Sequence, residues 1–122
     1  LVLAHFGGLN VEYMQKAVAL AKEFPNIYLN TTALDPDRVK RQVSNASYSR
    51  SVKPVEQSKE QIRTVFLDAL ATIPHKILFG SDLGYYPPEE YTMWPVNELS
   101  QEMQQKILVD NPTALFTKMK KL

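Results

Sequence analysis

The sequence predicts an α/β fold in which parallel strands alternate with helices, and three observations support this prediction. First, three short apolar runs are each followed by glycine or polar residues, as expected for strands that are buried on both faces. Second, segments with apolar residues at helical spacing separate these runs. Third, each step from strand through helix to strand is the connection that parallel neighbours require. The predicted strands are Leu1–Ala4, Ile27–Leu29 and Ile77–Gly80.

The composition is that of a globular protein and argues against several classes of function. Fourteen basic and thirteen acidic residues give a net charge of +1, whereas a nucleic-acid-binding domain usually has a clear basic excess. There is no cysteine, which excludes disulfides and thiolate metal sites within the chain. No apolar run approaches the roughly 18 residues of a membrane span, and no signal peptide is visible. We therefore expect a cytoplasmic protein that acts on a small molecule.

Capping residues define the two predicted helices that separate the strands. Asn10 is a suitable N-cap for a helix over Val11–Phe24, which Pro25-Asn26 ends. Ser58 and Gln61 have the spacing of a capping box, which predicts a helix over Lys59–Thr72. This second helix is expected to bury six apolar residues: Ile62, Val65, Phe66, Ala69, Leu70 and Ile73.

Two more helices are predicted near the carboxyl end of the chain. The first is capped by Asn97 or Ser100 and runs to Leu108. We expect a break after it, because Asn111 is a good N-cap and Pro112 fits the first helical turn. The last helix is expected to face inward with three apolar residues: Leu115, Phe116 and Met119.

A long loop is predicted for residues 33–55. Within it, Asp35-Pro36 can start one or two helical turns over Asp37–Val43. Loops of this length in compact domains are usually functional or mobile. One interpretation is a solvent-facing segment whose basic residues are hydrated. The other is a lid over an anionic substrate, with Arg50 or Lys53 pairing with a carboxylate.

Polar side chains follow the predicted strands at the points where the strands end. Because the carboxyl ends of parallel strands meet at one edge of a sheet, His5, Asn30–Thr32 and Asp82 are expected to converge there. A histidine and an aspartate in this position can form a proton-transfer pair or provide two ligands for a metal such as zinc. The alternative is structural, with His5 as a hydrogen-bonded core histidine and Asp82 as a turn residue.

An aromatic cluster follows Asp82 and consists of Tyr85, Tyr86, Tyr91 and Trp94. It is a candidate for core packing, for a pocket wall, or for a subunit contact in a homo-oligomer. His75 precedes the third strand, on the opposite edge of the sheet, and is predicted to be a surface residue. The predicted substrate-binding residues are Asn30, Thr32, Arg50 and Tyr85.

Four motifs in this order resemble those of the amidohydrolase-related, metal-dependent hydrolases. His5-Phe6-Gly7-Gly8 is similar to the H-x-G-G signature of that family, and Pro25–Thr32 is similar to its next strand, P-N-(V/I)-Y-x-(D/N)-(T/S). Ile77–Asp82 is similar to the last barrel strand, I-L-F-G-(S/T)-D, and Asp110–Phe116 resembles the start of the closing helix. The motifs span most of the chain and leave the loops at 33–55 and 84–97 unexplained.

The resemblance implies that residues 1–122 are a single partial domain, the C-terminal part of a (β/α)8 TIM barrel with about strands 6–8. A complete barrel takes about 250 residues. We therefore expect further residues before Leu1, with the H-x-H pair and the fifth-strand histidine that supply most metal ligands in this family. A small doubly wound domain is the alternative for a chain that starts near Leu1.

The resemblance also implies a chemistry. Asp82 matches the eighth-strand metal ligand, often also the general base toward the attacking water, and His5 matches the sixth-strand histidine that acts as acid, base or polarising group. The expected cofactor is a divalent metal, with zinc as the first choice. The expected reaction is hydrolysis of a C–N or C–O bond in a small, carboxylated or cyclic substrate. Non-oxidative decarboxylation, and a degenerate barrel that only binds a ligand, are the alternatives.

Overall fold

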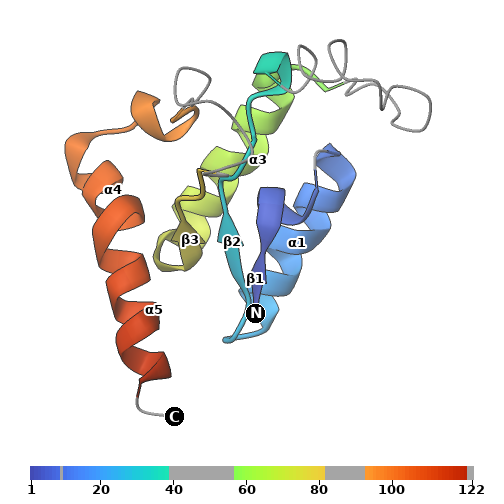
Figure 1. The fold of residues 1–122 in the computed structure, drawn as a ribbon. Coiled ribbons are helices and arrows are strands. Elements are labelled where there is room, and N and C mark those ends of the chain that lie inside the picture. The colour runs from blue at the N-terminus through green and yellow to red at the C-terminus, as the bar shows by residue number, and fades with distance from the viewer. Residues whose placement is uncertain (9, 39–56, 82–92, 121–122) are drawn as a thin grey trace, which may run out of the picture.

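The chain forms a three-stranded parallel sheet with helices packed around it, as Figure 1 shows. This computed structural model describes residues 1–8, 10–38, 57–81 and 93–120. The strands β1 (Val2–Leu3), β2 (Tyr28–Asn30) and β3 (Ile77–Leu78) lie in the order 1-2-3, and both pairings are parallel. The α/β class with parallel strands is therefore confirmed. The assignment of these strands to positions 6–8 of a barrel stays a prediction.

Helix α1 (Val11–Glu23) follows β1 and has the predicted N-cap. The side-chain oxygen of Asn10 accepts a hydrogen bond of 2.8 Å from the amide of Glu12, which satisfies one of the free donors at the helix start. The helix buries one face, formed by Met14, Ala17, Val18 and Ala21. Within the described ranges, no helix combines the length and apolar character needed to cross a membrane.

Helix α3 (Lys59–Thr72) packs beside α1 and carries the predicted capping box. The Ser58 hydroxyl accepts from the Gln61 amide at 3.3 Å, and the Gln61 side chain accepts from the Ser58 amide at 2.9 Å. All six of the apolar residues expected to face inward are buried. The ring centres of Phe66 and Phe6 lie 5.7 Å apart, so α3 contacts the turn that follows β1.

Lys76, immediately before β3, ties this strand to the end of α1. Its ammonium donates hydrogen bonds to the carbonyl oxygens of Ala21 at 2.5 Å and Phe24 at 2.7 Å. These carbonyls belong to the C-terminal turn of the helix, where a cation is favourable. Burial lowers the pKa of the Lys76 ammonium below its usual value, and nearby Lys118 acts in the same direction. The sequence did not predict this contact.

The C-terminal helices are continuous, so the predicted break at Asn111 is wrong. Helix α4 (Gln101–Gln105), capped by Ser100, leads through a π-helical turn (Lys106–Asp110) into α5 (Asn111–Met119). The wide turn lies where the ring of Pro112 would otherwise crowd the preceding carbonyls. Asn111 has helical backbone angles and does not cap the helix; instead its side-chain amide donates to the carbonyls of Pro74 and Ile77, both at 2.7 Å.

The predicted inward face of α5 is only partly correct. Leu115 is half-buried, but Phe116 is 61% exposed and Met119 is 55% exposed. The side-chain bonds of Asn111 to the start of β3 fix how the helix is turned. This orientation leaves Phe116 and Met119 largely without cover from the described part of the chain.

Candidate functional site

The carboxyl ends of the three strands lie at one edge of the sheet, the upper edge in Figure 1. His5 follows β1, Asn30 is the last residue of β2, and Gly80 lies two residues beyond β3. The amide of Thr31 donates to the carbonyl of Leu78 at 3.0 Å, which continues the ladder between β2 and β3 up to this edge. The parallel register therefore places three chain segments side by side where the sequence predicted a site.

The side-chain oxygen of Asn30 joins two of these segments. Its Oδ1 atom accepts one hydrogen bond from the backbone amide of His5 and another from the backbone amide of Thr32, each at 3.2 Å. Because the side-chain nitrogen of asparagine cannot accept hydrogen bonds, the two N–H donors identify the atom that faces them as the oxygen. His5, Asn30 and Thr32 thus come together, as the topology predicts, while their roles toward a substrate stay predictions.

The imidazole of His5 has a defined orientation. Its Nδ1 atom lies 3.0 Å from the backbone carbonyl oxygen of Thr32. A carbonyl oxygen only accepts, so Nδ1 carries the hydrogen, and in the neutral ring Nε2 carries the lone pair. Within the described residues Nε2 has no hydrogen-bond partner. His5 can therefore accept or donate a proton, or bind a metal ion, through Nε2.

The backbone around His5 is in an uncommon conformation. His5, Phe6 and Ala33 have φ angles of 53°, 54° and 50°, in the left-handed region. Each such residue costs roughly 1–2 kcal/mol relative to the right-handed form. Phe6 counteracts this strain because its side chain is fully buried against Phe66. Conformations of this kind cluster at functional sites, where the rest of the fold holds them in place.

Two glycines make the close approaches that this edge needs. A Cβ atom at Gly7 would overlap the side chain of Ala17 in α1, and its φ of 89° also favours glycine. At Gly80, a Cβ atom would overlap the hydroxyl oxygen of Thr32 and lie 3.1 Å from the Asn30 Nδ2 atom. The sequence showed Gly80 only as the end of an apolar run, so its contact with β2 was not predicted.

Thr31 lies between Asn30 and Thr32 but is not part of the same contacts. Its side chain is buried, and no described residue forms a hydrogen bond with its hydroxyl. Successive residues of an extended chain point to opposite faces, which separates Thr31 from Asn30. Only two residues of the predicted Asn30–Thr32 group therefore form the network around His5.

Several predicted site residues lie outside the described residues. These are Asp82, Arg50, Lys53, Tyr85, Tyr86 and Tyr91, together with most of the 33–55 loop. The structure gives no geometry for them, so the proposed metal ligand and the lid stay predictions. In the ranges that the structure does describe, no group of three or more His, Asp or Glu residues could hold a metal ion.

A second polar group lies where α3 begins. Asp35 is buried and caps the helical residues 36–38 by accepting from the amide of Asp37 at 3.1 Å, as predicted. Its carboxylate also lies 3.3 Å from the ammonium of Lys59, the first residue of α3. That ammonium stands 5.5 Å from the ring centre of Trp94. The sequence did not indicate that these three residues meet.

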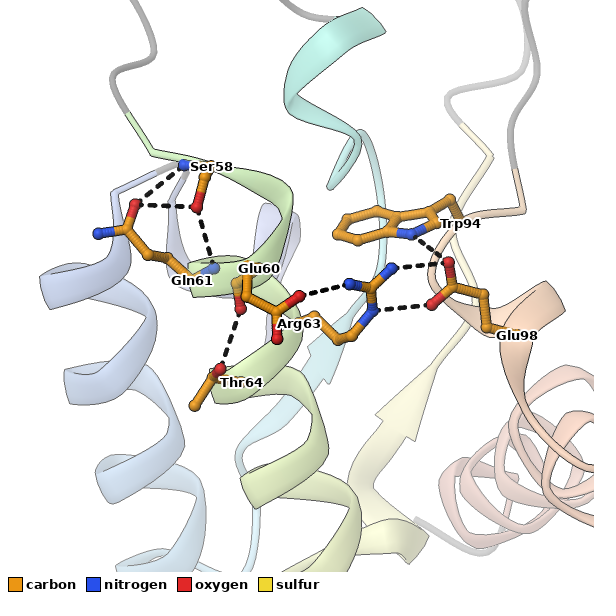
Figure 2. A network of polar contacts seen from close by, with 7 residues as sticks. All are labelled: Ser58, Glu60, Gln61, Arg63, Thr64, Trp94 and Glu98. Carbon is orange, nitrogen blue, oxygen red and sulfur yellow. Dashed lines mark hydrogen bonds and ion pairs between the residues drawn. The ribbon is translucent and has the colours of Figure 1, made fainter.

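Trp94 is held in the core by the network shown in Figure 2. Its indole Nε1 donates to Glu98 at 3.0 Å, and both Glu98 oxygens accept from the guanidinium of Arg63 at 2.9 Å. The guanidinium also bonds Glu60 and lies 5.8 Å from the centre of the Trp94 ring. Core packing, one of the roles predicted for the aromatic cluster, is thus confirmed for Trp94.

Acid is expected to weaken this network. The guanidinium of Arg63 holds the pKa of the Glu98 carboxyl below its usual value, and the Trp94 hydrogen bond adds to this. The pKa of this carboxyl is 4.5 in the unfolded chain and lower in the folded protein. At pH values above 4.5 the ionised carboxylate therefore stabilises the fold, and this contribution is lost as the pH falls through the pKa of the folded state. Urea unfolding gives the free energy of unfolding at neutral and at acid pH. The decrease between the two should be smaller in Glu98→Gln than in wild type.

The effect should be modest, because the Glu98 side chain is 42% exposed. Glu102→Gln, which removes an exposed carboxylate from the nearby helix α4, is the matched control and should retain the wild-type pH dependence. An identical pH dependence in Glu98→Gln and wild type would contradict the assignment.

Comparison with known families agrees with the motifs at this edge. The family model described as Amidohydrolase matches residues 1–118 of the chain. No curated protein and no solved structure matches the chain significantly. The parallel strands that alternate with helices are consistent with the TIM barrel of that family. Because the family model covers almost the entire chain, the chain belongs to the amidohydrolase family.

Proposed function

We propose that this chain contributes the His5–Asp82 edge of the active site of a metal-dependent hydrolase. The substrate would be a small, carboxylated or cyclic molecule with a C–N or C–O bond to be cleaved. The observation that supports this proposal best is the hydrogen bond from His5 Nδ1 to the Thr32 carbonyl. It leaves the Nε2 lone pair available at the edge where chemistry occurs in parallel α/β folds.

The orientation of His5 is compatible with the divalent metal that members of this family usually bind. A metal-ligating histidine commonly donates its other ring N–H to a backbone carbonyl, which is the arrangement at His5. We propose Asp82 as the metal ligand from this chain, with His5 beside it and zinc as the expected ion. When bound, such an ion supplies Lewis-acid polarisation of the substrate and lowers the pKa of water.

The side chains of this chain would then have separate roles in proton transfer and in substrate binding. We propose that Asp82 accepts the proton from the attacking water, and that His5 exchanges a proton with the substrate through Nε2. The Asn30 Nδ2 atom and the Thr32 hydroxyl have no hydrogen-bond partner among the described residues, and we propose that both bind substrate oxygens. Arg50 and Tyr85 are proposed to contact the carboxylate and the ring of the substrate.

The proposal is tested by Asp82→Asn in the full-length protein. Asparagine keeps the size of the side chain but removes its charge and its ability to accept a proton. We expect the bound metal per chain to fall, and the rate with the best substrate to fall by roughly 100-fold or more. Metal content is measured by mass spectrometry. Rates are measured over a panel of amides, esters, lactones and cyclic imides, with aromatic carboxylic acids assayed for carbon dioxide release.

Asp68→Asn is the matched control, because Asp68 lies on the exposed face of α3 and its carboxylate pairs with Lys22. It should keep the metal content and activity of wild type. Full metal occupancy and undiminished activity in Asp82→Asn would refute the site assignment. Carbon dioxide release without any hydrolysis would replace the proposed reaction by decarboxylation. Cytoplasmic location and a homo-oligomeric state stay predictions.

A further inference from the structure

We propose that Asn30 is a positioning residue for His5: its side-chain oxygen holds together the two backbone segments that fix the His5 imidazole in the Nδ1–H form. The inference rests on the proposed function, because it takes His5 Nε2 as the working atom of the site. It concerns the oxygen end of the Asn30 side chain, whereas substrate binding is proposed for the nitrogen end.

The hydrogen bonds around Asn30 form a closed ring. Oδ1 accepts from the His5 amide and from the Thr32 amide, each at 3.2 Å. The ring is closed on the other side by the His5 imidazole, whose Nδ1 donates to the Thr32 carbonyl at 3.0 Å. One oxygen therefore sets the distance between the residue that carries the imidazole and the residue that carries its acceptor.

The left-handed conformation of the flanking residues explains why this connection is needed. His5 and Phe6 lie on one side of the ring and Ala33 on the other, all with positive φ angles. Neither segment would keep this backbone conformation by itself, because L-residues disfavour it. The Asn30 oxygen satisfies the amides of both segments, so it stabilises both turns together. Without it, the Thr32 carbonyl is no longer held opposite Nδ1.

Gly80 shows that Asn30 is held from the other direction too. A Cβ atom added at Gly80 would be only 3.1 Å from the Asn30 Nδ2 atom, so the segment that follows β3 lies beside the nitrogen end of the side chain. The oxygen is turned toward β1 and its own strand, and the nitrogen toward β3. Asn30 thus lies between the segments that follow β1 and β3, at the end of β2.

The experiment compares Asn30→Asp and Asn30→Leu in the full-length protein. Aspartate keeps an oxygen that can accept both backbone amides, whereas leucine has similar size and accepts nothing. The readout is the ¹⁵N chemical shift of the two imidazole nitrogens in protein labelled at histidine, measured at mildly alkaline pH without substrate. His5 is assigned with a His5→Gln variant. His75, which is exposed, serves as an internal reference that should average over both tautomers.

We expect wild type and Asn30→Asp to show His5 with a hydrogen on Nδ1 alone. In Asn30→Leu the two ring nitrogens should move toward the averaged shifts of His75. If Asn30→Leu fails to fold, the aspartate variant still decides, since loss of the Nδ1–H form there overturns the proposal. A wild-type His5 spectrum in folded Asn30→Leu overturns it as well. Asn26→Leu, a change at an exposed turn on the opposite edge, should leave the spectrum unaltered.

Kinetics separate this inference from the proposed function. If the hydrolase activity is present, Asn30→Leu should lower kcat by about 10- to 100-fold, because His5 is misplaced. Asn30→Asp should retain most of kcat, because the accepting oxygen is kept, and should raise KM, because a charged oxygen that repels substrate oxygens replaces the nitrogen donor. If no hydrolysis is found but the His5 spectrum responds as expected, the positioning role stands and the proposed function fails. If the protein is an active hydrolase but the His5 spectrum of Asn30→Leu is that of wild type, the proposed function stands and the positioning role fails.

Discussion

Gly80→Ala is expected to lower kcat/KM by roughly 100-fold or more, although it adds a single methyl group. The new Cβ would overlap the Thr32 hydroxyl oxygen and press on the Asn30 amide, so these two side chains must rotate or the segments that carry them must move apart. Overpacking of this kind also costs about 1–3 kcal/mol of folding free energy. Steady-state kinetics and urea unfolding measure the two effects separately.

A second substitution shows whether the overlap is the cause. Thr32→Ala removes the hydroxyl that the alanine at position 80 would strike, so the double variant should regain much of the stability lost in Gly80→Ala. Its activity should stay low, since the Thr32 hydroxyl is proposed to bind the substrate. Additive stability losses in the double variant would argue against this packing, and so would wild-type behaviour of Gly80→Ala.

Phe6→Ala is expected to destabilise the protein by about 3–5 kcal/mol. Phe6 is fully buried, packs against Phe66, and holds the left-handed turn that contains His5. The truncation removes a large apolar side chain and leaves a cavity between the sheet and α3. Chemical denaturation of both proteins gives the difference in the free energy of unfolding.

Phe24→Ala is the control for this prediction. Phe24 follows α1 and its side chain is 45% exposed, so the same truncation there should change stability by less than about 1 kcal/mol. If both variants lost similar stability, the burial of Phe6 would not be what stabilises the turn. A Phe6→Ala protein that folds should also show reduced order at the neighbouring His5 imidazole.

The sequence was sufficient to predict the parts of this fold that depend on local signals. The helix starts at Asn10 and Ser58 follow from side chains that bond amides two or three residues away, and both caps are present. The convergence of His5 with Asn30 follows from strand direction alone. In each case the physical cause lies within a few residues of the chain or in the handedness and direction of its elements.

Contacts between distant segments could not be predicted in this way. Asn111 stands before a proline, a local pattern typical of a helix start, yet its side chain donates to the carbonyls of Pro74 and Ile77, which lie before and at the start of β3. Lys76 looked like an ordinary charge before a strand, and only the position of the α1 terminus explains its burial. The role of Asp82 stays a prediction of the motif.

The network around Trp94 has a consequence for the segment that carries Asp82. That segment leaves β3 just after Gly80, which is packed against β2, and returns at Trp94, which Glu98 and the cations of α3 hold in place. Both ends are fixed by contacts formed during folding. Bringing the ends of a connecting segment together costs entropy that grows only slowly with its length. At residues 81–93 this cost is met when the fold itself forms, because both anchors belong to the packed part of the molecule.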